Sequence, residues 1–339
     1  MTISPRDSVL DALSGERGDR PPAAVFTQSA TVGQMERTGV SWPEAHSSPH
    51  AMAVLGAAQA DLFGFPTVRV PFCVSVEAGA LGCPLDMGTV RSQPTVLPGP
   101  FSLDPLEGTS EGSDLLPSPG EFVSSGRPMC VAEAVSELSR THGDCTVVAG
   151  VTGMLTCMSQ MFGAESLVLG ALTCPDLVRR WSDLLCRRLQ EYIGLLTGSG
   201  ADVITLGEAA ASPDVIDPAM FDNLTGDGLH RIFGSCDART CLHICGGVLP
   251  ILGAMEATGA DSLSLEGSVD PYRASLAVGG RIALVGNVGP VDPLLTGSPA
   301  DVRESARRSE DAGFDIIAPG CGVPPMTPDI NMRALAGYR

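Results

Sequence analysis

The sequence contains no lysine. All 21 of its basic residues are arginine, and they stand against 39 acidic residues, so the formal net charge is −18. Without lysine, a lysine Schiff base and the phosphate-binding P-loop are both excluded. The negative charge also disfavours nucleic acids and anionic membrane surfaces as partners, because both attract basic proteins.

Aromatic residues and long apolar runs are scarce as well. Aromatic side chains make up 4% of the 339 residues, and no apolar run approaches the roughly 20 residues of a membrane-spanning helix. The N-terminal stretch carries Asp7, Asp11, Glu16 and Asp19 in place of an apolar segment, so we expect no targeting segment and no membrane insertion. Eleven cysteines in such a chain predict free thiols in the cytoplasm.

Short apolar segments alternate with helical ones along most of the chain. We expect helices at 5–15, 49–63, 175–196 and 300–312, and strands at 23–27, 67–71, 146–150, 202–206, 240–245, 262–265, 282–285 and 315–318. Such alternation is typical of a parallel sheet. It predicts an α/β protein, a single (β/α)8 TIM-barrel domain over residues 1–339 with an N-terminal helical extension.

An open, doubly wound sheet is the alternative fold. It is disfavoured because no Gly-x-Gly-x-x-Gly motif follows an early strand. Residues 99–126 are rich in Gly, Pro, Ser and acidic residues, and we expect them to form a long surface excursion rather than a linker between domains.

Barrel enzymes carry their active sites at the carboxyl ends of the strands. The residues at the expected strand ends are Thr27, Gln28, Gly153, Met154, Glu208, His243, Cys245, Glu266, Asn287 and Cys321. His243 and Cys245 are two positions apart on one strand and therefore point to the same side. Cys321 lies between two glycines just past the last strand, where the thiol is accessible.

His243, Cys245 and Cys321 together make a plausible zinc-ligand set. Zinc takes imidazole and thiolate ligands, and a catalytic zinc site keeps three protein ligands and one open position. The alternative is a hydrogen-bonded core histidine beside two buried thiols. Neither motif is Cys-x-x-Cys, so a structural zinc ribbon or a thioredoxin-like redox site is not expected.

Two glutamates at strand ends are candidate catalytic residues. Glu266 ends the strand beside the His/Cys strand, and Glu208 ends the strand on its other side. Each could be a fourth ligand, a hydrogen-bond partner of His243, a general acid–base group, or only a polar residue at a strand end. We favour Glu266 as the occasional ligand and Glu208 as a residue on the substrate side.

Several segments carry motifs of a known family. In the N-terminal half they are 27–28, 41–46, 82–83 and 86–89, and in the C-terminal half 200–204, 211–214, 242–246, 284–288, 318–324 and 327–328. These segments resemble the methylcobamide:coenzyme M methyltransferases of the uroporphyrinogen decarboxylase superfamily, over nearly the whole chain. In that resemblance His243, Cys245 and Cys321 fall on the zinc-ligand positions.

The resemblance implies a zinc-dependent methyltransferase that moves a methyl group from a methylcorrinoid to a thiol acceptor, coenzyme M first among the candidates. Thr27, Gln28, Met154 and Asn287 are the expected cofactor-binding residues. The corrinoid is expected on a separate carrier protein, because this chain has no Asp-x-His-x-x-Gly motif. The partners would be that carrier and a small thiol, with a homo-oligomer left open. Backbone N–H groups or Arg69 are candidates for binding the sulfonate.

Departures from the family pattern keep the acceptor open. Residues 26–31 contain no arginine, which disfavours porphyrinogen decarboxylation, and Glu208 stands where Asp is expected in the coenzyme M enzymes. Residues 153–158 also differ. Tetrahydrofolate, homocysteine, a methylated substrate, a decarboxylase-like activity and a non-catalytic interaction protein therefore remain alternatives.

Overall fold

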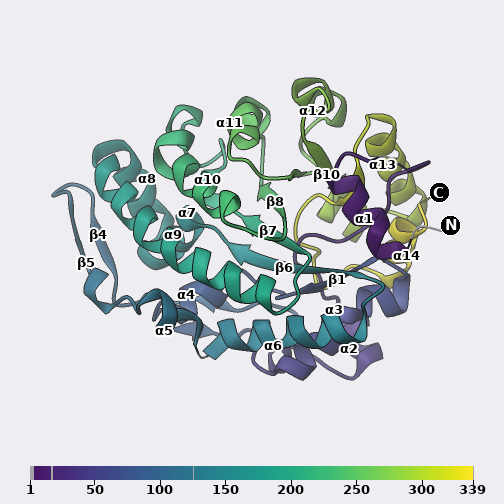
Figure 1. Ribbon diagram of the computed structural model, residues 1–339, viewed down its shortest axis with the longest axis horizontal. Helices are drawn as coiled ribbons and strands as arrows, with labels where there is room; N and C mark the ends of the chain where they lie inside the picture. Colours follow the sequence, from purple (N-terminus) through teal and green to yellow (C-terminus); the bar gives the residue numbers. More distant parts are fainter. Residues whose placement is uncertain (1–3, 17, 125, 339) are drawn as a thin grey trace.

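The computed structural model describes residues 4–16, 18–124 and 126–338. Its centre is a curled, seven-stranded parallel sheet in which neighbouring strands follow one another along the chain (Figure 1). The strands are β1 (Thr67–Val70), β6 (Thr146–Thr152), β7 (Val203–Gly207), β8 (Arg239–Ile244), β9 (Ser262–Leu265), β10 (Ala283–Val288) and β11 (Ile316–Pro319). The predicted α/β barrel fold is confirmed, and all their carboxyl ends lie at one end of the barrel.

The prediction of a strand at 23–27 is wrong. Ala23 forms a single bridge with Ile317 of β11, and the N–H of Ala24 donates to the Ile317 carbonyl at 2.9 Å. On the other side, the N–H of Val25 donates to the Oγ1 of Thr67, 3.0 Å away, instead of to a backbone carbonyl. This segment therefore lies between β11 and β1 where an eighth strand would be, but a side-chain hydroxyl replaces the backbone ladder toward β1.

Helices form the outer layer around the sheet (Figure 1). They are α1 (Pro5–Leu13), α2 (Val32–Thr38), α3 (Pro49–Phe63), α4 (Val76–Ala80), α5 (Pro119–Val123), α6 (Gly126–Thr141), α7 (Met154–Phe162), α8 (Ala164–Thr173), α9 (Pro175–Gly198), α10 (Asp227–Gly234), α11 (Leu252–Ala257), α12 (Pro271–Val278), α13 (Pro299–Asp311) and α14 (Asp329–Ala336).

Helix α3 shows why the sequence folds this way locally. The Ser48 side chain accepts from the N–H of Ala51, and Pro49 occupies the first turn, where its missing N–H costs nothing. Gly64 ends the helix in the left-handed conformation at φ 81°. The Ala/Met/Leu periodicity of residues 49–63 predicted the helix with the same bounds.

Helix α1 closes the amino end of the barrel. Its Val9, Ala12 and Leu13 pack into the same buried cluster as the inward-facing side chains of the strands, Val148 and Val203 among them. The outward-facing strand residues belong instead to a larger cluster that packs against the helices. Alternate residues along each strand therefore face the interior of the barrel.

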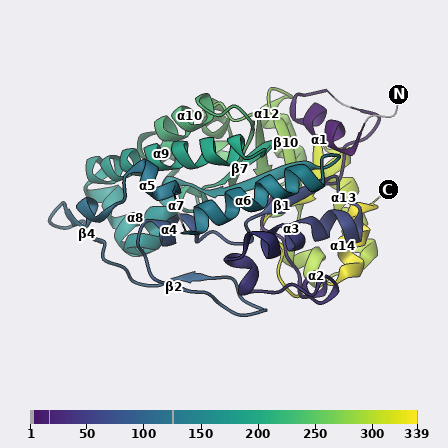
Figure 2. The ribbon, with the colours of Figure 1, turned by 60° about the horizontal axis from the view of Figure 1, so that its bottom comes forward.

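The segment at 99–126, which we expected to be a surface excursion, contains regular secondary structure. It contains the antiparallel strands β4 (Ser102–Asp104) and β5 (Thr109–Glu111), followed by α5. Trp181 of α9 donates its indole N–H to the hydroxyl of Ser110 at 3.1 Å and so ties this hairpin to the helical layer. Figure 2 shows β4, together with the short strand β2 (Leu85–Asp86), along one margin of the molecule.

Among the described residues, no single helix is long and apolar enough to cross a membrane. The pair α7 and α8 passes that test only when taken together, and its two helices are bent by 115°.

Candidate metal centre

Three side chains from two strand ends converge at the carboxyl end of the barrel. The Sγ of Cys245 lies 3.3 Å from the Nε2 of His243 and 3.5 Å from the Sγ of Cys321. All three ligand atoms lie within 4.8 Å of one another. One imidazole and two sulfurs at these separations are a donor set suited to a soft or borderline metal such as zinc.

His243 is oriented by the neighbouring strand. Its Nδ1 lies 3.1 Å from the Oγ and 3.2 Å from the carbonyl oxygen of Ser264 on β9, and the ring is buried. A proton on Nδ1 satisfies either acceptor and leaves the lone pair of Nε2 directed at the two sulfurs. Such a partner commonly sets the tautomer of a metal-binding histidine.

The turn that carries Cys245 is held from two sides. Gly246 donates its N–H to the carboxylate of Glu266, and Gly247 donates to Asp214 Oδ2 at 3.1 Å. Gly246 has φ 80°, and a Cβ there would collide with the Asp214 carboxylate. The turn after Cys245 therefore requires glycine for two independent reasons.

The turn that carries Cys321 is held by the segment that replaces the eighth strand. The hydroxyl of Thr27 donates to the Cys321 carbonyl at 2.7 Å. The N–H of Val323 donates to the Gln28 carbonyl at 2.7 Å. Thr27 and Gln28 thus lie beside the cluster, where the sequence placed them, and both make contacts that position the Cys321 turn.

Asn287 supports the loop that follows β9. Its Nδ2 donates to the carbonyls of Glu266, at 3.2 Å, and Val269, at 2.7 Å, and its Oδ1 accepts from the hydroxyl of Ser309 at 2.9 Å. The side-chain amide of Asn287 therefore holds the backbone of Glu266 in position. The Glu266 carboxylate accepts a hydrogen bond from the Gly246 N–H, and it is not one of the three groups in the donor cluster.

Glu208 and Met154 are not brought to the cluster. The Glu208 carboxylate is buried at the N-terminus of α7, where it accepts from the N–H groups of Leu155, at 2.7 Å, and Thr156, at 3.2 Å. Burial raises the pKa of Glu208 to about 7, and these hydrogen bonds lower it only partly. The Met154 side chain is buried too, with its sulfur 3.5 Å from the Ser182 hydroxyl of α9. Their assigned roles stay predictions.

The two thiols share one hydrogen bond. A hydrogen bond from the Cys245 thiol to the Cys321 sulfur, together with the His243 ring, lowers the pKa of Cys321 to about 4. The same hydrogen bond, together with burial, raises the pKa of Cys245. A divalent cation at this site would favour deprotonation of both sulfurs.

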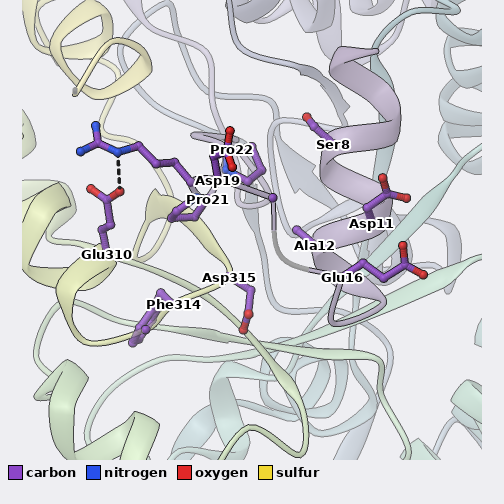
Figure 3. Close-up of a pocket in the computed structure, with 13 residues that line it drawn as sticks. Ser8, Asp11, Ala12, Glu16, Asp19, Pro21, Pro22, Glu310, Phe314 and Asp315 are labelled. Carbon is purple, nitrogen blue, oxygen red and sulfur yellow. Dashed lines mark ion pairs between the residues drawn. The ribbon is translucent and has the colours of Figure 1, made fainter. Parts of the chain in front are cut away.

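A cavity of about 370 Å³ lies at the opposite end of the barrel (Figure 3). It is lined by residues of α1, such as Asp11, by Pro22, which precedes segment 23–27, and by Phe314, which precedes β11. Arg20 pairs with Glu310 across it at 3.4 Å. Because catalytic groups of barrel enzymes lie at the carboxyl ends of the strands, this cavity is not where the chemistry is expected.

The fold and the donor cluster together define a TIM-barrel protein with a candidate thiolate–imidazole metal site. Residues 4–339 match the family model described as uroporphyrinogen decarboxylase (URO-D). The chain belongs to this family.

Within that family, relatives that match nearly the whole chain are named methyltransferases. The chain is 33% identical over 333 residues to "Methylcobamide:CoM methyltransferase MtaA" of Methanosarcina barkeri, covering 98% of this chain and 96% of that protein. It is 30% identical over 336 residues to "Methylcobamide:CoM methyltransferase MtbA" of Methanosarcina acetivorans, with the same coverage. A solved structure titled "methyltransferase from Methanosarcina mazei" superposes with a TM-score of 0.92 at 34% identity and covers 99% of this chain and 98% of that one. The resemblance to the methylcobamide:coenzyme M methyltransferases is confirmed.

Sequence reasoning missed the residues that hold the ligands in place. Ser264 was part of a recognised strand but was given no role, although alternating serines in the Ser262–Leu265 strand indicate a polar inward face. Asp214 belonged to a recognised motif, yet its contact with the Gly247 N–H depends on a loop from the neighbouring strand and leaves no local signal.

Proposed function

We propose that this protein is a zinc-dependent methyltransferase that transfers a methyl group from a methylcorrinoid, carried on a separate protein in the cytoplasm, to the thiol of coenzyme M. The convergence of His243, Cys245 and Cys321 at the mouth of the barrel carries the proposal. The names of the full-length relatives support the donor and the acceptor.

His243 and the two cysteines would hold the zinc and leave one position open to the acceptor. Bound zinc stabilises the acceptor as a thiolate, so a nucleophile exists at neutral pH. The acceptor's proton leaves to solvent, its sulfur forms the bond to the methyl carbon, and the carbon–cobalt bond breaks with both electrons staying on cobalt. Ser264 keeps the His243 ring in place, and Glu266 and Asp214 keep the Cys245 turn in place.

Anaerobic spectrophotometry tests the proposal. The purified chain, with its metal content determined by mass spectrometry, is mixed with methylcobalamin and with coenzyme M, homocysteine or tetrahydrofolate. We expect about one zinc per chain and demethylation with coenzyme M in preference to the other acceptors. Cys245→Ala should abolish both zinc binding and demethylation, whereas Cys236→Ala, a half-buried cysteine near the amino end of β8, should preserve both.

Two results would contradict the proposal. A chain that binds no zinc at micromolar concentrations lacks the metal centre. A zinc-loaded chain that demethylates neither methylcobalamin nor a methylcorrinoid carrier with any thiol is not this enzyme.

A further inference from the structure

One short loop contacts both of the turns that carry the cysteines of the donor cluster. It consists of residues 266–269 and connects β9 to α12. The carboxylate of Glu266 accepts a hydrogen bond from the N–H of Gly246, the residue that follows Cys245. The loop is thereby joined to the first of the two cysteine turns.

The backbone of the same loop packs against the second cysteine turn. Gly320 precedes Cys321, and a Cβ at Gly320 would lie 2.6 Å from the backbone N of Gly267 and 3.1 Å from the Cα of Glu266. The two backbones therefore lie directly against each other, because no side chain fits between them. A displacement of the loop would be transmitted to both cysteine turns.

Asn287 of β10 holds this loop at both of its ends. Its Nδ2 donates to the carbonyl of Glu266 at 3.2 Å and to the carbonyl of Val269 at 2.7 Å. Both partners are acceptors, so the amide has to present its NH2 group to the loop. The residue is 6% exposed, and water has little access to replace these hydrogen bonds.

Ser309 of α13 sets the orientation of that amide. Its hydroxyl accepts from the backbone N–H of Asn287 at 3.3 Å and donates to the Oδ1 of the same residue at 2.9 Å. The other acceptor for its single proton, the Ser305 carbonyl, is farther away at 3.3 Å. With Oδ1 held toward α13, Nδ2 is directed at the loop. A chain of hydrogen bonds thus runs from the outer helical layer to the metal ligands.

We propose that Ser309 and Asn287 are positioning residues of the metal centre, which act through the loop 266–269 to hold the turns of Cys245 and Cys321 at the separation that one cation requires. This inference rests on the metal centre of the proposed function and adds the contacts that preorganise it. Ligands that must first be ordered bind less tightly, because the ordering costs free energy.

Metal affinity and the cobalt spectrum test the proposal. Asn287→Asp keeps the shape of the side chain but turns a carboxylate oxygen toward two carbonyls, so we expect zinc affinity to fall about 10- to 100-fold. Ser309→Ala removes one hydroxyl and should lower it about 3- to 10-fold. Competition with a chromophoric chelator measures both. In the cobalt(II)-substituted chain, the absorption of thiolate-bound cobalt should weaken in both variants.

Ser182→Ala is the matched control. Ser182 is also a buried serine of an outer helix, at 3% exposed, but its hydroxyl contacts the sulfur of Met154. It should lower the free energy of unfolding about as much as Ser309→Ala and leave zinc affinity and the cobalt spectrum unchanged. Wild-type zinc affinity in Ser309→Ala and in folded Asn287→Asp, or an equal loss in Ser182→Ala, overturns the positioning role while the proposed function stands. Ser309→Ala decides the matter where Asn287→Asp fails to fold.

A wild-type chain that binds neither zinc nor cobalt overturns the proposed function, and a trivalent arsenical then decides the positioning of the two sulfurs alone. Phenylarsine oxide joins two adjacent thiols through arsenic with loss of water, and mass spectrometry of the digested chain detects the link between Cys245 and Cys321. We expect the link to form at least about tenfold more slowly in Ser309→Ala and Asn287→Asp than in Ser182→Ala. Equal rates in these variants overturn the inference.

Discussion

The Sγ atoms of Cys245 and Cys321 lie 3.5 Å apart although 76 residues separate them in the chain. Cys245 follows β8 and Cys321 follows β11, and curling of the sheet brings the two strand ends to the same mouth. The two turns are held by different contacts, Glu266 and Asp214 for one and Thr27 and Gln28 for the other. The candidate metal site thus depends on the closure of the barrel as much as on the three side chains that form it.

Replacing one sulfur should weaken metal binding without unfolding the chain. Cys321→Ser puts a hard, protonated oxygen where a soft thiolate ligand stood, so we expect zinc affinity to fall at least about 100-fold. Competition with a chromophoric chelator measures this affinity, and Cys236→Ser is the control. Equal affinities for the two variants would show that Cys321 is not a ligand.

Replacing Ser264, which lies beside His243, should lower the zinc affinity less than replacing Cys321 does. Ser264→Ala removes the hydroxyl 3.1 Å from His243 Nδ1 but leaves the Ser264 carbonyl at 3.2 Å. Outer partners of metal-binding histidines contribute 10- to 100-fold, and with the carbonyl retained we expect a loss of about tenfold. The chelator competition applies again. Affinity equal to that of the wild type would mean that the carbonyl alone orients the ring.

The first turn of α7 has no room for a side chain at its N-cap. Gly153→Ala would place a Cβ against the Glu208 carboxylate, which the N–H groups of α7 hold in place. We expect the free energy of unfolding to fall by about 1–3 kcal/mol, as for other overpacked buried sites. Gly194→Ala in α9 meets nothing within 4 Å and should raise it by several tenths of a kcal/mol. Chemical denaturation of both variants compares them, and a neutral Gly153→Ala would contradict the predicted collision.

A buried glutamate should make the fold less stable as the pH rises. Burial raises the pKa of Glu77 to about 7, and one of its carboxylate oxygens has no hydrogen-bond partner. The neutral form is the one the fold favours, so its contribution is complete below about pH 4.5, the ordinary value, and is lost as the pH rises through 7.

Glu77→Gln removes that ionisation. The difference in unfolding free energy between variant and wild type should therefore increase from pH 5 to pH 8, by up to about 3 kcal/mol in favour of the variant. Denaturation at both pH values measures it, with Glu133→Gln on the exposed face of α6 as the control. A difference that does not change with pH would show that Glu77 ionises normally.

Local patterns were enough to place the seven strands of the parallel sheet and the helices α1, α3, α9 and α13. The helix at 49–63 and the strand at 262–265 were predicted with the bounds the structure gives them, because their capping residues and apolar runs are contiguous in the chain. The pairing of His243 with Cys245 needed only the two-residue period of a strand. The family resemblance, and with it the pairing of Cys321 with them, also came from sequence motifs.

Contacts across the barrel could not be derived in this way. The sequence does not show how segment 23–27 is held between its neighbours. The segment forms backbone hydrogen bonds with β11, but its hydrogen bond to β1 is made to the Thr67 hydroxyl. Nor does the sequence show that Glu208 turns to the N-terminus of α7, away from the metal ligands. The sequence alone predicted the seven strands of the parallel sheet and which of their side chains share a face, because these follow from a short-range period. Only closure of the sheet decided which strand ends meet, and therefore which side chains form the candidate metal site and which support them.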